Sequence, residues 1–308
     1  MRKYIIDTDL GADSDDAAAL MYMLGKMRKG ECEISAITLC TARSGAAATA
    51  NAICSLFGYK IPIGTYSGKP LLCDDADNYA AEIAARYKKP EIETENAVRL
   101  MRKIFTKNER TDVIAIGPLC NIAAFLKSSA DDISPLCGQD LAEKKAGKFY
   151  VMGGSFFGND EAMTDENFAE WNIEQDIESA KYVAENTPNE AVFCPFETGV
   201  KVGTYLKNTF GAVREITETF FKNCDERSGV KYVTDENRTR PSWDPLTCMV
   251  ALGENGFAFS PLGNVFVDNR GKTVFEADFC GKRKYLLCKN DFKAVEKELN
   301  EFLKNCLN

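Results

Sequence analysis

The sequence of 308 residues contains no histidine. Without an imidazole, the chain cannot form a Ser-His-Asp or Cys-His catalytic site, and it cannot hold zinc through histidine ligands. Any proton transfer must therefore use carboxylates, tyrosine, lysine, cysteine or water activated by a metal ion. This absence narrows the possible enzyme classes before any motif is considered.

The chain also lacks the features of membrane proteins and of nucleic-acid-binding proteins. No apolar run approaches the length of a membrane span, and the first residues do not form a signal-peptide pattern. The net charge is -8, and the lysines and arginines are scattered along the chain. Because phosphate contacts need a basic face, a nucleic-acid partner is disfavoured. We expect a small-molecule partner and no membrane.

Cysteine is abundant, with 12 residues, but no two cysteines form a C-x-x-C pair. Many of them lie inside apolar runs, as Cys40, Cys54, Cys194 and Cys248 do. This pattern favours reduced, mostly buried thiols in a cytoplasmic protein over a disulfide framework or a zinc site.

Apolar runs typical of buried strands alternate with stretches typical of helices. This alternation predicts an α/β fold with an open, mostly parallel sheet and helices on both faces. No repeat or linker interrupts the pattern, so we expect a single domain over residues 1–308. The predicted strands are Lys3–Thr8, Glu33–Leu39, Val113–Ile116, Lys148–Met152 and Ala191–Cys194, with a hairpin of Val265–Asp268 and Thr273–Phe275. The predicted helices begin near Asp15 and after Asp176, and cover Ala46–Phe57, Glu95–Phe105, Asn121–Leu126, Val213–Phe221, Pro245–Leu252 and Phe292–Leu303.

Five aspartates lie within ten residues, directly after the first predicted strand. They fall in the turn between that strand and a helix, which is where open α/β sheets build their sites. A cluster of oxygen ligands suits a hard cation such as Ca²⁺ or Mg²⁺. A solvated acidic turn, with Asp15 or Asp16 capping the helix, explains the same residues. The five are Asp7, Asp9, Asp13, Asp15 and Asp16.

Three later segments place polar side chains beside chain turns. The Gly-Pro turn before Asn121 either offers a backbone carbonyl to a hard cation or makes Asn121 the N-cap of a helix. Glu170 and Asn172 point the same way if their segment is extended, and both suit sugar hydroxyls. Asp244, between Trp243 and a proline, is either a helix cap or a metal ligand. Both tryptophans of the chain neighbour these polar residues, as aromatic faces do in many nucleobase and sugar sites.

Taken in order, these segments resemble the motifs of the inosine/uridine-preferring nucleoside hydrolase family. The segments DTDLGADSDDA, GPLCNIA, MGG, AEWNI and WDP follow the family's order between residues 7 and 245. The resemblance implies the nucleoside hydrolase fold and Ca²⁺-dependent hydrolysis of the N-glycosidic bond of ribonucleosides, giving ribose and a free base. It also implies a homodimer or homotetramer.

The resemblance implies roles for individual residues as well. The Ca²⁺ ligands would be Asp9, Asp16, Asp244 and the backbone carbonyl of Cys120. Asp9 would also take the proton from the attacking water. The ribose-binding residues would be Asp15, Glu170, Asn172, Asn159 and Asn167. Trp243 and Trp171 would form the base pocket, and Asp7 and Asp13 would support the ligands or replace one of them.

The chain departs from the family's motifs at three points. Two extra residues, including Asp13, lie between Gly11 and the following aspartate pair. Trp243 stands where many members have a histidine that protonates the leaving base. Stacking of the base on Trp243 or Trp171 would raise the basicity of the base and let solvent protonate it. An expected Gly-Asn pair is replaced around Arg43, which becomes a candidate for a polar contact to the base.

Three other functions fit parts of the sequence. An enzyme of the same fold could act on a different N-ribosyl or glycosyl compound, because the base-side residues diverge. An aspartate-dependent phosphatase would use Asp7 as the nucleophile and Asp9 as its acid partner, although no downstream Lys and Gly-Asp pair completes that site. A non-catalytic metal-binding sugar sensor is the third.

Overall fold

A computed structural model describes residues 1–69, 71–72, 78–87, 92–108, 110–156, 168–253 and 256–307. Ten strands form one sheet in the order β11-β10-β12-β7-β6-β5-β1-β2-β3-β4. Every neighbouring pair is parallel except those of β10, which is antiparallel to β11 and β12. The strands are β1 Arg2–Thr8, β2 Cys32–Leu39, β3 Ile63–Thr65, β4 Glu95–Asn96, β5 Thr111–Ala115, β6 Ala146–Met152, β7 Ala191–Cys194, β10 Gly263–Val267, β11 Thr273–Ala277 and β12 Arg283–Tyr285. The mostly parallel sheet predicted from the sequence is therefore confirmed.

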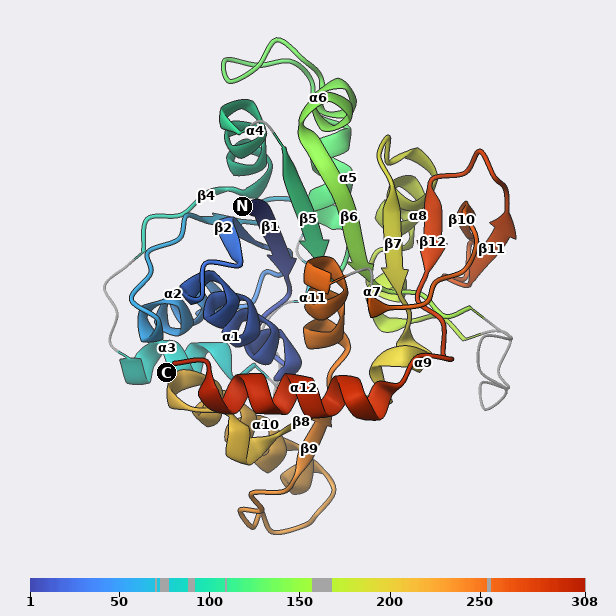
Figure 1. The fold of residues 1–308 in the computed structure, drawn as a ribbon. Coiled ribbons are helices and arrows are strands. Elements are labelled where there is room, and N and C mark those ends of the chain that lie inside the picture. The colour runs from blue at the N-terminus through green and yellow to red at the C-terminus, as the bar shows by residue number, and fades with distance from the viewer. Residues whose placement is uncertain are drawn as a thin grey trace.

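Helices cover both faces of this sheet (Figure 1). Alternate residues of β1 face opposite sides, as the pleat of a strand requires. Tyr4 and Ile6 pack in a core with α1, α2 and α11, whereas Ile5 packs in a second core with α4, α5, α6 and α8. The helices are α1 Asp15–Arg28, α2 Ala46–Leu56, α3 Ala80–Tyr87, α4 Ala97–Lys107, α5 Cys120–Leu126, α6 Gly138–Lys145, α7 Trp171–Gln175, α8 Ile177–Asn186, α9 Phe196–Gly199, α10 Gly211–Arg227, α11 Trp243–Gly253 and α12 Phe292–Asn305.

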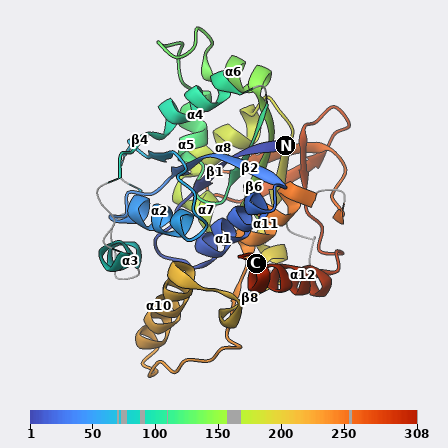
Figure 2. The ribbon, with the colours of Figure 1, turned by 60° about the vertical axis from the view of Figure 1, so that its left-hand side comes forward.

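One segment lies outside the sheet and its two layers of helices. The short antiparallel pair of β8 (Gly203–Tyr205) and β9 (Thr239–Pro241) flanks α10, and the three elements extend together from one end of the molecule (Figures 1 and 2). The carboxyl ends of β1, β5, β6 and β7 point toward this end (Figure 1). The segment therefore stands over the edge of the sheet where a site is expected.

Three local predictions are wrong. Asn121 is not an N-cap, because α5 begins at Cys120 with Leu119 in the capping position. The segment around Glu170 is not extended throughout, since Glu170 is the N-cap of α7 and Asn172 lies inside that helix. Asp244 does not precede its helix, which begins one residue earlier at Trp243. In the first and third cases a helix starts earlier than the polar residue suggested, and in the second a short helix was not predicted.

The sequence led us to expect free thiols in place of disulfides, and no membrane-spanning helix. Each of the eleven cysteines in the described ranges is a free thiol, and seven of them are buried. Among the described helices, none combines the length and apolar character needed to cross a bilayer.

Candidate active site

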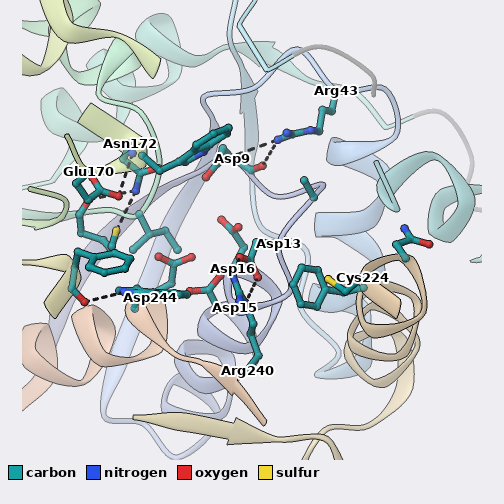
Figure 3. A pocket seen from close by; sticks show the side chains of 18 of the residues that line it. Asp9, Asp13, Asp15, Asp16, Arg43, Glu170, Asn172, Cys224, Arg240 and Asp244 are labelled. Carbon is teal, nitrogen blue, oxygen red and sulfur yellow. Dashed lines mark hydrogen bonds and ion pairs between the residues drawn. The ribbon is translucent and has the colours of Figure 1, made fainter. Parts of the chain in front are cut away.

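A cavity of about 430 Å³ opens at the carboxyl ends of the central strands (Figure 3). Its walls come from the β1–α1 turn, the ends of β5 and β6, the starts of α7, α9 and α11, and one side of α10. Ten residues singled out in the sequence line it together: Asp9, Asp13, Asp15, Asp16, Arg43, Glu170, Trp171, Asn172, Trp243 and Asp244.

Three carboxylates meet at the centre of this cavity (Figure 3). Asp15, Asp16 and Asp244 each offer an oxygen within 4.8 Å of the others, and all three are buried. Burial, followed by the charges of neighbouring aspartates, raises the pKa of all three side chains well above the ordinary value. The backbone N–H of Asp244 donates to Asp15 Oδ2 at 3.3 Å, and the hydroxyl of Thr8 donates to Asp16 Oδ1.

A hard cation fits this group. Three buried carboxylates so close together repel one another, and the few N–H and O–H groups around them leave most of that charge uncompensated. Oxygen-only ligands of this kind suit Ca²⁺ or Mg²⁺ and not zinc or copper. The donor set is therefore consistent with the cation that the sequence motifs imply.

Asp9 lies on the other side of this group, next to Arg43 (Figure 3). Arg43 Nη1 lies 3.8 Å from Asp9 Oδ2 and donates to the Asp9 carbonyl at 3.4 Å. Burial raises the pKa of Asp9 to about 6, although the guanidinium of Arg43 opposes the shift. A Cβ on Gly117 would lie 2.7 Å from Asp9 Oδ1, so a glycine there leaves room for the carboxylate.

Asp7 and Cys120 lie outside the lining of this cavity. Asp7 is fully buried in β1, where its Oδ1 accepts from Thr38 Oγ1 at 2.5 Å and from Asn121 Nδ2 at 2.8 Å. Burial raises the pKa of Asp7 to about 7. Cys120, at the start of α5, lines a separate cavity. The buried position of Asp7 leaves the phosphatase hypothesis without an accessible nucleophile.

Glu170 and Asn172 are held by the start of α7. Glu170 Oε1 accepts from the N–H of Asn172 at 3.0 Å, and Oε2 accepts from the N–H groups of Ile173 and Gly154 at 3.3 and 3.2 Å. Burial raises the pKa of Glu170 to about 7, and these N–H donors oppose the shift. Asn172 Nδ2 donates to the carbonyl of Met152 at 3.3 Å. The N-cap of α7 thus fixes two polar side chains at the cavity wall.

Aromatic rings form the wall opposite α10. The ring of Trp243 stacks on Phe196 with centroids 5.5 Å apart, and its Nε1 donates to the Phe196 carbonyl at 2.9 Å. A Cβ on Gly199 would lie 2.0 Å from Trp243 Cδ1, so only glycine lets the indole take this position. Trp171 is 56% exposed and borders the cavity at its rim. Trp243 is therefore fixed, whereas Trp171 faces solvent.

Sequence reasoning missed the contribution of α10 and β9. Phe220, Asn223, Cys224 and Arg227 of α10 line the cavity, and so does Arg240 of β9. No motif marks the α10 residues, and only proximity to the WDP segment marks Arg240. The predicted ribose contacts Asn159 and Asn167 lie outside the described residues.

Comparisons with known proteins bear on the same site. A family model described as inosine-uridine preferring nucleoside hydrolase matches residues 4–296. No curated protein matches the sequence. An inosine-uridine preferring nucleoside hydrolase from Bacillus anthracis superposes with a TM-score of 0.70 at 16% identity, covering 99% of both chains. A purine-preferring ribonucleoside hydrolase from Gardnerella vaginalis gives 0.71 at 19% identity, also over 99% of both chains.

A more divergent neighbour shares the fold as well. The type III effector protein XopQ, solved with adenosine diphosphate ribose, has a TM-score of 0.70 at 14% identity over the whole of this chain and 94% of its own. Identities this low establish the fold only. The family model spans nearly the whole chain, however. The chain thus belongs to the inosine-uridine preferring nucleoside hydrolase family of ribonucleoside N-glycosyl hydrolases.

Proposed function

We propose that residues 1–308 form one domain that hydrolyses ribonucleosides to ribose and a free base, with Ca²⁺ as the bound cation. The observation that carries the proposal is the meeting of the three-carboxylate group, Asp9 and the Glu170–Asn172 pair in a single cavity. Membership of the family does not by itself require that a divergent chain keeps all of these side chains in one cavity.

The proposed reaction uses carboxylates where other hydrolases use histidine. As the N-glycosidic bond breaks, positive charge develops on the ribose, and the surrounding carboxylates stabilise it. Asp9 accepts a proton from the water whose oxygen attacks C1′. Asp15, Glu170 and Asn172 hold the ribose hydroxyls, and these contacts strengthen as the sugar flattens toward the transition state.

Asp16 and Asp244 would hold the ion beside the ribose-binding Asp15, and Asp9 and the Cys120 carbonyl are proposed as further ligands. When bound, Ca²⁺ supplies positive charge that makes nearby water more acidic and orients neighbouring oxygen atoms. The three carboxylates in turn need that charge, because they would otherwise repel one another.

Trp243 cannot act as the missing histidine. Its single N–H is already donated to the Phe196 carbonyl, so the side chain has no proton to give. We propose that Trp243 and Trp171 border the base. Asn159 and Asn167 are proposed to lie near the 5′-hydroxyl.

A second candidate is an N-ribosyl compound that carries negative charge. Three arginines, Arg43, Arg227 and Arg240, contribute to the cavity lining, and a guanidinium is a common partner of phosphate. The neighbour solved with adenosine diphosphate ribose has the same fold.

We further propose a cytoplasmic homodimer or homotetramer, which size-exclusion chromatography with light scattering would test.

The first experiment is a chromatographic assay of the free base released from inosine, uridine, adenosine and cytidine, with adenosine diphosphate ribose and inosine monophosphate alongside. The protein is assayed as purified, after treatment with a chelator, and after addition of Ca²⁺. Chelator-sensitive release that Ca²⁺ restores is the expected result. Release from the charged compounds alone would favour the second candidate. No release from any compound by protein that binds Ca²⁺ would contradict both.

A further inference from the structure

Two of the chain's departures from its family, Asp13 and Trp243, contact the same residue, Arg240. Asp13 belongs to the extra residues of the β1–α1 turn, and Arg240 precedes the tryptophan that replaces histidine. Arg240 Nε donates to Asp13 Oδ1 at 2.9 Å, and Nη2 donates to Asp13 Oδ2 (Figure 3). This two-point ion pair joins residues that are 227 positions apart in the sequence. The inserted aspartate therefore positions an arginine in the wall of the cavity.

Two aromatic rings hold the guanidinium of Arg240 from both sides. Its Cζ lies 4.8 Å from the ring centroid of Phe220 and 4.9 Å from that of Trp243. Trp243 is itself fixed by Phe196, as described above. Cation–π contacts and the ion pair with Asp13 leave the guanidinium little freedom. Its orientation is thus set before any ligand binds.

The ion pair uses only one edge of the guanidinium. A guanidinium carries five N–H donors, and Asp13 accepts along the edge formed by Nε and Nη2. In the described part of the chain, no atom accepts a hydrogen bond from Arg240 Nη1. The second edge, formed by Nη1 and Nη2, remains available on a side chain that lines the cavity and is 27% exposed.

We propose that Arg240 binds the leaving base through this second edge and that the base is a 6-oxopurine. The proposal rests on the proposed function. Two parallel N–H donors match two adjacent acceptors, which a 6-oxopurine presents as N7 and O6. Adenine presents a donor at position 6, and uracil has no adjacent pair of acceptors. Hypoxanthine and guanine are therefore the bases that this edge selects.

The same contact would stabilise the departing base, which is the step that a histidine assists in many family members. As water adds to C1′, the electron pair of the C1′–N9 bond leaves with the base, and its negative charge spreads onto N7 and O6. The fixed guanidinium stabilises that charge, so the base can depart as an anion and take a proton from solvent afterwards. The proton lost by the attacking water goes to Asp9. The balance requires no other reactant.

The test compares Arg240→Lys with a matched control, Arg238→Lys. Lysine at position 240 keeps the charge beside Asp13 but loses the planar pair of donors. Arg238 lies two residues away on the approach to β9, pairs with Asp225 at 2.7 Å through two nitrogens and stacks 4.3 Å from Phe221, but it does not line the cavity. Both variants are first checked for thermal stability and Ca²⁺ affinity.

We expect the wild-type protein to favour inosine and guanosine over adenosine, uridine and cytidine in kcat/KM. Arg240→Lys should lose about 10- to 100-fold on inosine, the range for a good two-point contact to a base, and much less on adenosine. Arg238→Lys should keep the wild-type selectivity. An inosine-to-adenosine ratio unchanged in Arg240→Lys would overturn the proposal, as would a wild-type preference for adenosine, uridine or cytidine.

A wild-type protein that hydrolyses no nucleoside would contradict the proposed function and not, by itself, the role of Arg240. Titration calorimetry with hypoxanthine and 7-deazahypoxanthine separates the two failures. Tighter binding of hypoxanthine, lost in Arg240→Lys but not in Arg238→Lys, supports the base contact without catalysis. Equal binding of the two compounds, or no binding of either, overturns it.

Discussion

The three-carboxylate group makes a prediction in which one substitution has opposite effects with and without Ca²⁺. Asp244→Asn removes one negative charge and keeps the shape of the side chain. Without a cation, the substitution relieves repulsion from Asp15 and Asp16, so we expect the variant to be more stable than the wild-type protein. With Ca²⁺ in excess, the variant has lost a ligand charge, and the order of stability should reverse.

The size of the effect follows from the geometry. Two unit charges 4.8 Å apart repel by about 3.5 kcal/mol at an effective dielectric constant of about 20, and Asp244 forms two such pairs. Because the raised pKa values of the group let protons neutralise part of this charge, we expect a gain of about 1–3 kcal/mol in chelator. Ca²⁺ at 1,000 times its Kd should stabilise the wild-type protein by about 4.1 kcal/mol, a rise in Tm of roughly 6 °C, which exceeds the gain expected for the variant.

Thermal unfolding of both proteins, in chelator and in Ca²⁺, measures these quantities. Asp140→Asn is the control, since Asp140 is an exposed carboxylate in the first turn of α6, far from the cavity lining. That variant should change by less than about 1 kcal/mol and equally in both conditions. An Asp244→Asn protein that is less stable than wild type in chelator would refute the reasoning, because the charges would then not repel in the folded state.

Three further predictions concern single groups of the site. Asp9→Asn should lower kcat by about 10²- to 10⁴-fold, the usual contribution of a general base, and near-normal turnover on the best nucleoside would remove Asp9 from that role. Burial raises the pKa of Asp7 and of Glu170 to about 7, whereas both pKa values are near 4 in the unfolded chain. Because the unfolded chain then loses these protons first, the denaturation midpoint in chelator should fall as pH rises from about 4 to 7. A midpoint that rises over this range would contradict the burial of the two side chains. Gly199→Ala should displace Trp243 and weaken substrate binding, seen as a higher KM; an unchanged KM together with unchanged tryptophan fluorescence would show that the indole does not need this space.

The central part of the fold could be predicted because its signals are local. Runs such as Ala191–Cys194 are apolar enough to be buried on both faces, and the structure gives that strand the predicted bounds. The five aspartates fall at the end of β1 because a strand boundary and a helix start are both visible in the sequence. By contrast, β3 and β12 have only three residues each, too few for a period to be recognised.

The base side of the cavity could not be predicted because it depends on contacts between distant segments. The pairing of Asp13 with Arg240 has no local signature, and α10 meets the cavity only because the chain leaves the sheet and returns. Two helix starts were also misplaced, because α5 has the apolar Leu119 in its capping position and α11 begins at the apolar Trp243, before the aspartate. Tertiary packing fixes these starts.

Different segments of the chain form the two walls of the cavity. Asp9, Asp15 and Asp16 follow β1 of the ten-stranded sheet, whereas α10 and the β8–β9 pair form an excursion that runs from Gly203 to Pro241 outside that sheet. Insertions or substitutions in this excursion can therefore reshape the side of the site that meets the base while every strand keeps its neighbours. After gene duplication, new base specificities could evolve through the residues of this stretch that line the cavity, and a protein engineer would randomise those positions first and keep the buried face of α10 unchanged.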